Sequence, residues 1–167
     1  MLGTRFQRML LGTDGTVTHI LEAYAGEPIE VVKLLQEFDT SNDDDLDLGL
    51  AGEKVLRRRV LLRGRRSLRP LLYAEAVVVV ERVDPAFLEG LLETDKPIGV
   101  LLAESRTETF REILRVGRQP AGACAPALGI DASAEVFSRT YRVIARSQPM
   151  ILITERFRAD AFRELPA

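Results

Sequence analysis

Glu155 is a carboxylate set in a row of apolar residues near the end of the chain. The pattern of residues 138–157 predicts two strands joined by a tight turn at 147–149. Alternate residues of a strand share a face, so Glu155 points the same way as Ile153 and Phe157. An ionised carboxylate without a partner is costly there. We therefore expect Glu155 to be paired, to be protonated or to meet a ligand.

Arg58 is the matching anomaly near the middle of the chain. On the strand predicted for residues 55–63, Arg58 shares its face with aliphatic residues, whereas Arg57 and Arg59 form a charge row that suits solvent. An inward arginine and an inward glutamate could line one closed pocket. A guanidinium suits a carboxylate, and a carboxyl group suits a hydroxyl or a proton transfer, so a small anionic ring compound would fit. A structural salt bridge is the competing interpretation for each residue.

Glu75 interrupts the apolar strand predicted for residues 70–82. If this strand forms a hairpin with residues 53–63, Glu75 falls close to Arg58. It would then either neutralise and orient Arg58 or contact a ligand. A register slip of one residue would instead place the two side chains on opposite faces.

Length and composition describe an ordinary globular protein. The 167 residues fit one domain, expected to span residues 1–167, with 46% hydrophobic residues, 29% charged residues and a net charge of -2. This charge balance does not suggest a nucleic-acid binder. The single cysteine, Cys124, excludes an internal disulfide and fits a reducing compartment. With neither a signal peptide nor a membrane span evident, we expect a cytoplasmic protein.

The expected elements predict an α+β domain of antiparallel strands with a few helices. Helices are predicted at 4–11 and 16–25, separated by Asp14-Gly15, and at 84–93. Residues 28–38 predict a further strand, and residues 106–118 fit a helix or a strand. Residues 118–133 suggest a long loop. The acidic residues 39–50 fail the EF-hand pattern and predict a solvated loop, so we expect no metal site.

Four landmarks then stand in order along the chain. They are D-G-T-V-T at Asp14 to Thr18, Arg58 on its strand, K-P-I-G at Lys96 to Gly99, and S-R-T-Y…I-T-E-R-F ending at Phe157. Their order and spacing resemble the chorismate lyase (chorismate pyruvate-lyase) family, especially its divergent bacterial, archaeal and plastid branch. The resemblance covers about residues 10–157.

The resemblance implies a six-stranded antiparallel sheet flanked by helices around an internal ligand pocket. It also implies cofactor-free conversion of chorismate into 4-hydroxybenzoate and pyruvate. Arg58 matches the arginine that holds the ring carboxylate, and Glu155 matches the glutamate at the ring hydroxyl, which is implicated in catalysis. The other expected substrate-binding residues are Ile98 through its backbone amide, its neighbour Gly99, Val17 packed on the ring, its neighbour Thr16, and Glu75. Arg139 matches a recurrent arginine whose role we take as structural.

The chain departs from the chorismate lyase pattern at one position, and it also resembles a second kind of domain. Where the best-known members have an arginine near the position of Glu75, this chain has a carboxylate, which bears on substrate entry or charge balance. The effector-sensing domain of GntR-type transcription regulators shares the architecture, and Leu128-Gly129-Ile130 before the last hairpin also resembles it. Such a domain binds a small molecule without turning it over. The lack of a winged-helix segment before Asp14 favours the lyase.

Overall fold

Six strands form one antiparallel sheet in a computed structural model, which describes residues 4–13, 16–49 and 52–162. The strand order is β1-β2-β3-β6-β5-β4, and every neighbouring pair is antiparallel. The strands are β1 (Ile29–Thr40), β2 (Lys54–Gly64), β3 (Pro70–Val79), β4 (Phe110–Pro120), β5 (Glu135–Ala145) and β6 (Gln148–Arg158). The expected α+β class and six-stranded sheet are confirmed. Asp14-Gly15, the expected break between the first two helices, lies outside the described residues.

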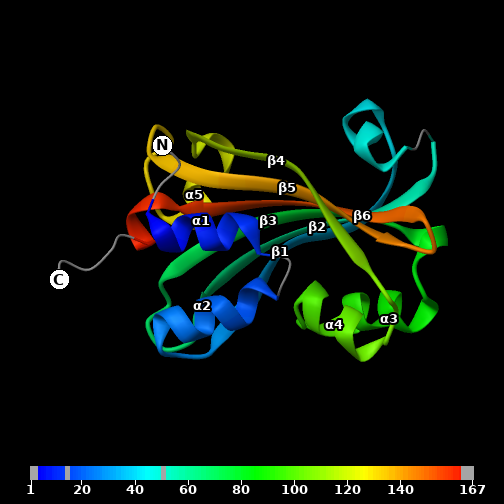
Figure 1. Cartoon of the computed structure of the whole chain (residues 1–167), viewed down its shortest axis with the longest axis horizontal. Helices are drawn as coiled ribbons and strands as arrows, with labels where there is room; N and C mark the ends of the chain where they lie inside the picture. Colours follow the sequence, from blue (N-terminus) through cyan, green and yellow to red (C-terminus); the bar gives the residue numbers. More distant parts are fainter. Residues whose placement is uncertain (1–3, 14–15, 50–51, 163–167) are drawn as a thin grey trace.

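Four helices cover one face of the sheet, called the inner face below. They are α1 (Arg5–Gly12), α2 (Val17–Ala25), α3 (Pro85–Glu93) and α4 (Ile98–Glu104). Figure 1 shows α2 towards one end of this side of the sheet and α3 with α4 towards the other. Each pair of helices buries its own cluster: Leu10 and Leu21 pack with Leu72 and Phe157, whereas Leu91 and Leu101 pack with other inner-face residues. The inner face is therefore covered in two separate parts.

The opposite, outer face is covered at its two ends by short elements. The 3-10 helix η1 (Asp43–Leu48) buries Leu48 against Val55 and Val79, and α5 (Ala125–Leu128) buries Leu128 against Tyr73. Between α5 and β4 lies η3 (Gly122–Cys124), and two further 3-10 turns follow β3 and β6, at η2 (Val80–Arg82) and η4 (Ala159–Phe162).

Three local expectations are refined. The segment that fitted a helix or a strand is β4, because it pairs along the whole of β5. The acidic segment is not simply a solvated loop: within η1, Asp45 is 1% exposed and accepts a hydrogen bond from Arg57 Nη2 at 2.8 Å. The last hairpin turns at Arg146 and Ser147, both with positive φ, because Ala145 already pairs with Gln148.

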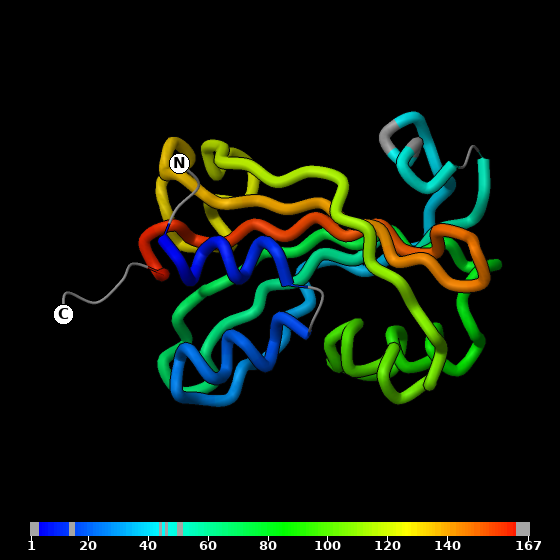
Figure 2. The backbone as a smooth tube through the Cα atoms, in the orientation of Figure 1, coloured from blue at the N-terminus to red at the C-terminus, as the bar shows by residue number. Residues whose placement is uncertain are grey.

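The last strand of the described chain, β6, lies in the middle of the sheet and not at its edge. Figure 2 shows the orange-to-red tube of β6 running between β3 and β5. This order brings Glu155 directly opposite Ala74 of β3, two strands away from Arg58.

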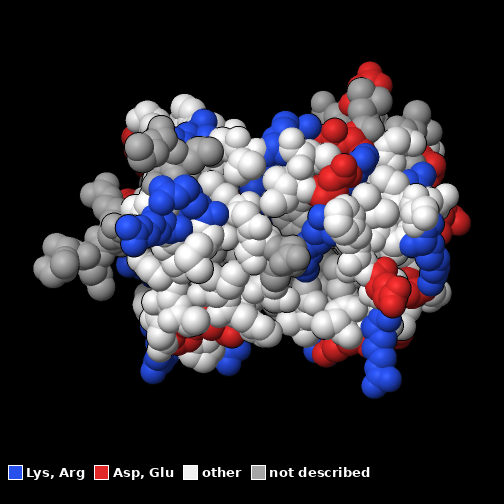
Figure 3. All heavy atoms as spheres, in the orientation of Figure 1, with Lys and Arg blue, Asp and Glu red and all other residues white. Residues whose placement is uncertain are grey.

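The surface carries charges of both signs. Figure 3 shows lysine and arginine interspersed with aspartate and glutamate over the face in view. None of the helices in the described part of the chain has the length and apolar character needed to span a membrane.

Candidate active site

Arg58 and Glu155 lie on the same face of the sheet, the inner one. Strand pairing sets Arg58 opposite Ala76 and Ala76 opposite Ile153, and Glu155 is the next inner-face residue along β6. Two strand spacings across and two residues along separate their Cα atoms by about 12 Å. The inner-face residues of β3 between them are Ala74 and Ala76, whose small side chains leave space above the sheet.

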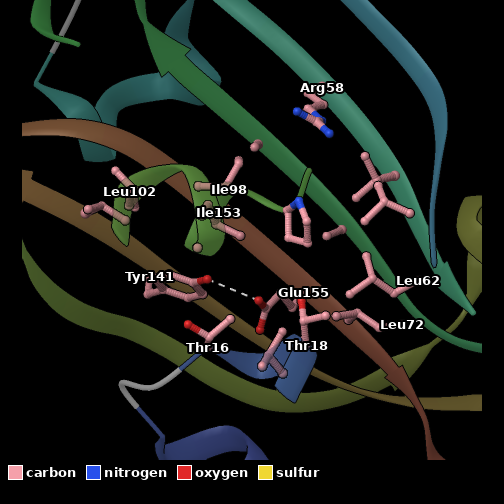
Figure 4. A pocket seen from close by; sticks show the side chains of 18 of the residues that line it. Thr16, Thr18, Arg58, Leu62, Leu72, Ile98, Leu102, Tyr141, Ile153 and Glu155 are labelled. Carbon is pink, nitrogen blue, oxygen red and sulfur yellow. Dashed lines mark hydrogen bonds between the residues drawn. The ribbon is translucent and has the colours of Figure 1, made fainter. Parts of the chain in front are cut away.

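This space is a cavity at the boundary between the two helical covers. The cavity and the solvent-filled space at its opening together take up about 670 Å³. Figure 4 shows Arg58 on one side of it and Glu155 with Tyr141 on another, with aliphatic side chains between. The lining residues include Thr16, Val17, Thr18, Arg58, Val60, Ala74, Ala76, Ile98, Gly99, Leu102, Arg111, Tyr141, Ile153 and Glu155. The expected internal pocket is present.

Arg58 is a buried cation with incomplete hydrogen bonding. Its exposure is only 2%, and its Nη2 donates to the carbonyl oxygen of Lys96 at 3.2 Å. Its Nη1 is buried and has no hydrogen-bond partner among the described residues. Burial lowers the pKa of the Arg58 guanidinium from its usual value, an effect that the charge of Asp95 partly opposes. An anionic ligand in the cavity would satisfy the remaining donor.

Glu155 is held by two donors. Arg139 Nε donates to Glu155 Oε2 at 2.5 Å, and the Tyr141 hydroxyl donates to Oε1 at 3.1 Å. All three side chains are buried. Arg139 Nη1 also donates to the carbonyl oxygens of Leu10, at 2.7 Å, and Thr13, at 2.8 Å. Of the three possibilities for Glu155, pairing is therefore realised, and the lone pairs that remain on the carboxylate can still accept a hydrogen bond from a ligand.

Tyr141 is fixed as a hydrogen-bond donor. Burial, reinforced by the adjacent Glu155 carboxylate, raises the pKa of the Tyr141 hydroxyl well above its usual value, so it keeps its proton at neutral pH. The Arg139 guanidinium lies 5.1 Å from the centre of the Tyr141 ring. Arg139 and Tyr141 together orient the Glu155 carboxylate from one side and leave its other side facing the cavity.

The beginnings of α2 and α4 meet at the cavity. Thr16 and Val17 at the start of α2, and Ile98 and Gly99 at the start of α4, all line it. A Cβ atom on Gly99 would lie only 3.1 Å from Thr16 Cγ2, so glycine permits this close approach. The amides of the first two residues of a helix have no partner inside it, and both helix starts favour negative charge.

The expected proximity of Glu75 to Arg58 is wrong. The register pairs Glu75 with Arg59 and Arg58 with Ala76, so Glu75 lies on the outer face, away from the cavity. There it accepts from Arg156 Nη1 at 2.7 Å and from the Tyr73 hydroxyl at 3.1 Å. The one-residue slip that the sequence left open is the arrangement observed.

Three polar residues that line the cavity, Thr18, Arg111 and Tyr141, are not among the predicted site residues. Thr18 ends the D-G-T-V-T landmark and Tyr141 ends S-R-T-Y, but neither landmark assigns them a role. Tyr141 could have been found, because it is two residues after Arg139 and so shares its face. Arg111 could not, because residues 106–118 fitted a helix equally well.

A family model described as "Chorismate pyruvate-lyase Rv2949c-like" matches residues 10–164. The chain belongs to this family. Among the relatives of this chain is the Chorismate pyruvate-lyase of Mycobacterium tuberculosis (strain H37Rv). The two sequences are 30% identical over 164 residues, which cover 95% of this chain and 82% of that protein. The Chorismate pyruvate-lyase of Mycobacterium leprae is 32% identical over 165 residues, covering 95% and 77%.

Several solved structures share this fold at low sequence identity, among them a transcriptional regulator of the GntR family. PhnF from Mycobacterium smegmatis has a TM-score of 0.71 at 17% identity, covering 91% of this chain and 67% of that one. The effector domain of PhnF has a TM-score of 0.68 at 18% identity, covering 87% and 90%. A GntR-family regulator from Bacillus cereus has a TM-score of 0.66 at 9% identity, covering 83% and 97%. At these identities the likeness concerns the fold alone.

Replacing Ala76 with leucine should fill the cavity, because the larger side chain would stand between Arg58 and Ile153. We expect the Kd for 4-hydroxybenzoate, measured by isothermal titration calorimetry, to rise at least about tenfold, with overpacking costing about 1–3 kcal/mol of unfolding free energy. Ala123→Leu, an exposed position outside the cavity, is the control. Unchanged affinity in the Ala76 variant would show that the ligand binds elsewhere.

Proposed function

We propose that this protein removes pyruvate from chorismate and leaves 4-hydroxybenzoate, with Arg58 binding the ring carboxylate and Glu155 accepting a hydrogen bond from the ring hydroxyl. The observation that carries the proposal is the buried Arg58 guanidinium with its unsatisfied Nη1, set across the cavity from the Glu155 carboxylate. A cation and an acceptor about 12 Å apart at their Cα atoms suit the two ends of one six-membered ring. Membership of the chorismate pyruvate-lyase family supports this assignment.

The reaction balances without a co-reactant. The ether bond between the ring and the enolpyruvyl side chain breaks, and the ring carbon that bears the hydroxyl loses its hydrogen. The terminal methylene of the side chain gains one hydrogen and becomes the methyl group of pyruvate. The ring gains its third double bond and becomes aromatic, which drives the reaction, so neither an oxidant nor a reductant is consumed.

The chain's own residues supply orientation and charge. Hydrogen bonding of the Arg58 guanidinium to the ring carboxylate, helped by the amides at the start of α4, fixes the ring in the cavity. At the other end Glu155, itself held by Arg139 and Tyr141, orients the ring hydroxyl and the adjoining leaving group. Val17 and the aliphatic lining exclude water, which strengthens both polar contacts.

A second function is supported by the regulators that share the fold. An effector-binding domain would use the same cavity, hold an aromatic acid through Arg58 and release it unchanged. The two proposals differ only in turnover, so a product assay separates them.

The purified protein should release pyruvate when mixed with chorismate. Pyruvate is measured by coupling to lactate dehydrogenase and following NADH oxidation, and 4-hydroxybenzoate by chromatography in the same sample. Equal amounts of the two products are expected. Binding of chorismate without either product would favour the effector-binding function.

Glu155→Gln should lower kcat about 10²- to 10⁴-fold, the usual effect of removing a positioned carboxylate from a reacting centre. Because Arg139 loses its buried counter-ion, the free energy of unfolding should also fall, and circular dichroism must confirm that the variant is folded at the assay temperature. Glu75→Gln is the matched control, since Glu75 is also paired with an arginine but on the outer face. Equal losses in the two variants would contradict the role given to Glu155.

Arg58→Ala should weaken binding of 4-hydroxybenzoate about 10- to 100-fold, because hydrogen bonds to a charged group are worth about 1.5–3 kcal/mol. Calorimetric titration gives the Kd directly. Arg59→Ala, the next residue with its side chain on the other face, should bind as the wild type does. If Arg58→Ala kept the wild-type affinity, the carboxylate would have to bind elsewhere.

A further inference from the structure

A second hollow adjoins the mouth of the cavity. It is formed by the end of α4, the loop that follows it and the start of β4, and it includes Thr107, Thr109 and Phe110. Four residues line both spaces: Thr16, Gly99, Leu102 and Arg111. The hollow, called the vestibule below, therefore shares a wall with the cavity, and Arg111 is the charged side chain of that wall.

Arg111 lies on the same face of the sheet as Arg58 but in the other half of the strand order. Its strand, β4, is the last in the sheet order, and its pairing with Val143 places it on the inner face. The guanidinium carbon lies 6.0 Å from the centre of the Tyr141 ring, and one of its nitrogens lies 3.7 Å from the position of a Cβ on Gly99. Following the strand order from β2 to β4, the polar groups across the cavity are Arg58 first, then Glu155 with its donor Tyr141, and then Arg111.

The two arginines differ in their surroundings. Arg58 is 2% exposed at the closed end, whereas Arg111 is half-buried where the cavity meets the vestibule. Chorismate carries two carboxylates, one on the ring and one on the side chain. The side-chain carboxylate leaves as part of pyruvate, and the ring carboxylate stays with 4-hydroxybenzoate. A deep cation and a cation at the mouth match this division.

We propose that Arg111 binds the carboxylate of the enolpyruvyl side chain and that pyruvate leaves through the vestibule; this rests on the proposed lyase function. Arg111 then determines specificity for a dicarboxylate over a monocarboxylate. When the ether bond breaks, the anion held by Arg111 is detached from the ring and lies beside the opening. 4-Hydroxybenzoate has no second carboxylate, so its binding depends on Arg58 and not on Arg111.

Arg111→Gln tests this division of roles in the full-length protein. We expect kcat/KM for chorismate to fall about 10- to 100-fold, since a hydrogen-bonded charge pair contributes about 1.5–3 kcal/mol. The Kd for 4-hydroxybenzoate should change less than about threefold, a ratio within about 0.65 kcal/mol. Pyruvate, added as a product inhibitor, should inhibit the variant less strongly than the wild type. Arg111→Lys, which keeps the charge without the planar fork, should recover part of the lost kcat/KM.

Arg115→Gln is the matched control, because Arg115 lies on the same strand with its side chain on the outer face, paired with Asp47. It should leave both quantities unchanged. The proposal would be overturned if Arg111→Gln lowered kcat/KM for chorismate and the affinity for 4-hydroxybenzoate by similar factors. It would also be overturned if the variant kept the wild-type kcat/KM and the wild-type Kd.

Failure of the lyase function would be seen separately, as a wild type that binds chorismate and releases no pyruvate. The ratio of the Kd values for chorismate and 4-hydroxybenzoate then replaces kcat/KM as the test. A ratio that Arg111→Gln raises would support dicarboxylate binding at Arg111, and an unchanged ratio would overturn it.

Discussion

A guanidinium held out of water with one of its nitrogens unsatisfied is the constraint on which the site depends. Within the ranges that the structure describes, Arg58 has a backbone carbonyl for one nitrogen and no carboxylate in direct contact, so its charge remains available inside the cavity. The other buried arginine of this face, Arg139, is fully engaged with Glu155 and two carbonyl oxygens. Arg139 and Glu155 thus form a compensated charge pair at the cavity, whereas Arg58 has no such partner among the described residues, which favours an anion beside it.

The space for a ligand comes from small residues on the central strand. Had Ala74 and Ala76 been as large as Leu72 and Val78 on the same face, the two helical covers would have packed over a continuous core. Instead β3 presents only the methyl groups of Ala74 and Ala76 to the cavity. Gly99 lets the starts of α2 and α4 approach each other closely. The cavity is therefore built into the packing of the sheet.

Much of this arrangement could be predicted from the sequence. The period-two patterns around Arg58 and Glu155 indicated which way each side chain points, and the landmarks indicated which loops meet them. The pairing of Glu75 could not be predicted, because register depends on the turn between two strands and a shift of one residue reverses every face. The partner of Glu155 was also missed, since Arg139 faces it only after β5 and β6 pair, and the alternation of charged and apolar residues does not distinguish a cavity from a core.

The same architecture serves chorismate pyruvate-lyases and the effector domains of transcription regulators, so the fold alone does not decide between turnover and binding. The residues around the ligand decide it. An arginine at the closed end would suffice to hold an aromatic acid. In the proposed lyase reaction, the Glu155 carboxylate, fixed by two donors at the other end, would also orient the bond that breaks.

The central position of β6 has a consequence for synthesis on the ribosome. β1, β2 and β3 can pair as a meander as soon as they emerge, but β4 and β5 join them only through β6, the last strand along the chain. At about 5–20 residues per second, Glu155 follows the end of β3 by roughly 4–15 s, during which a sheet of β1, β2 and β3 would have an unpaired edge at β3. The two halves of the sheet that line the cavity can therefore be joined only after β6 has been synthesised.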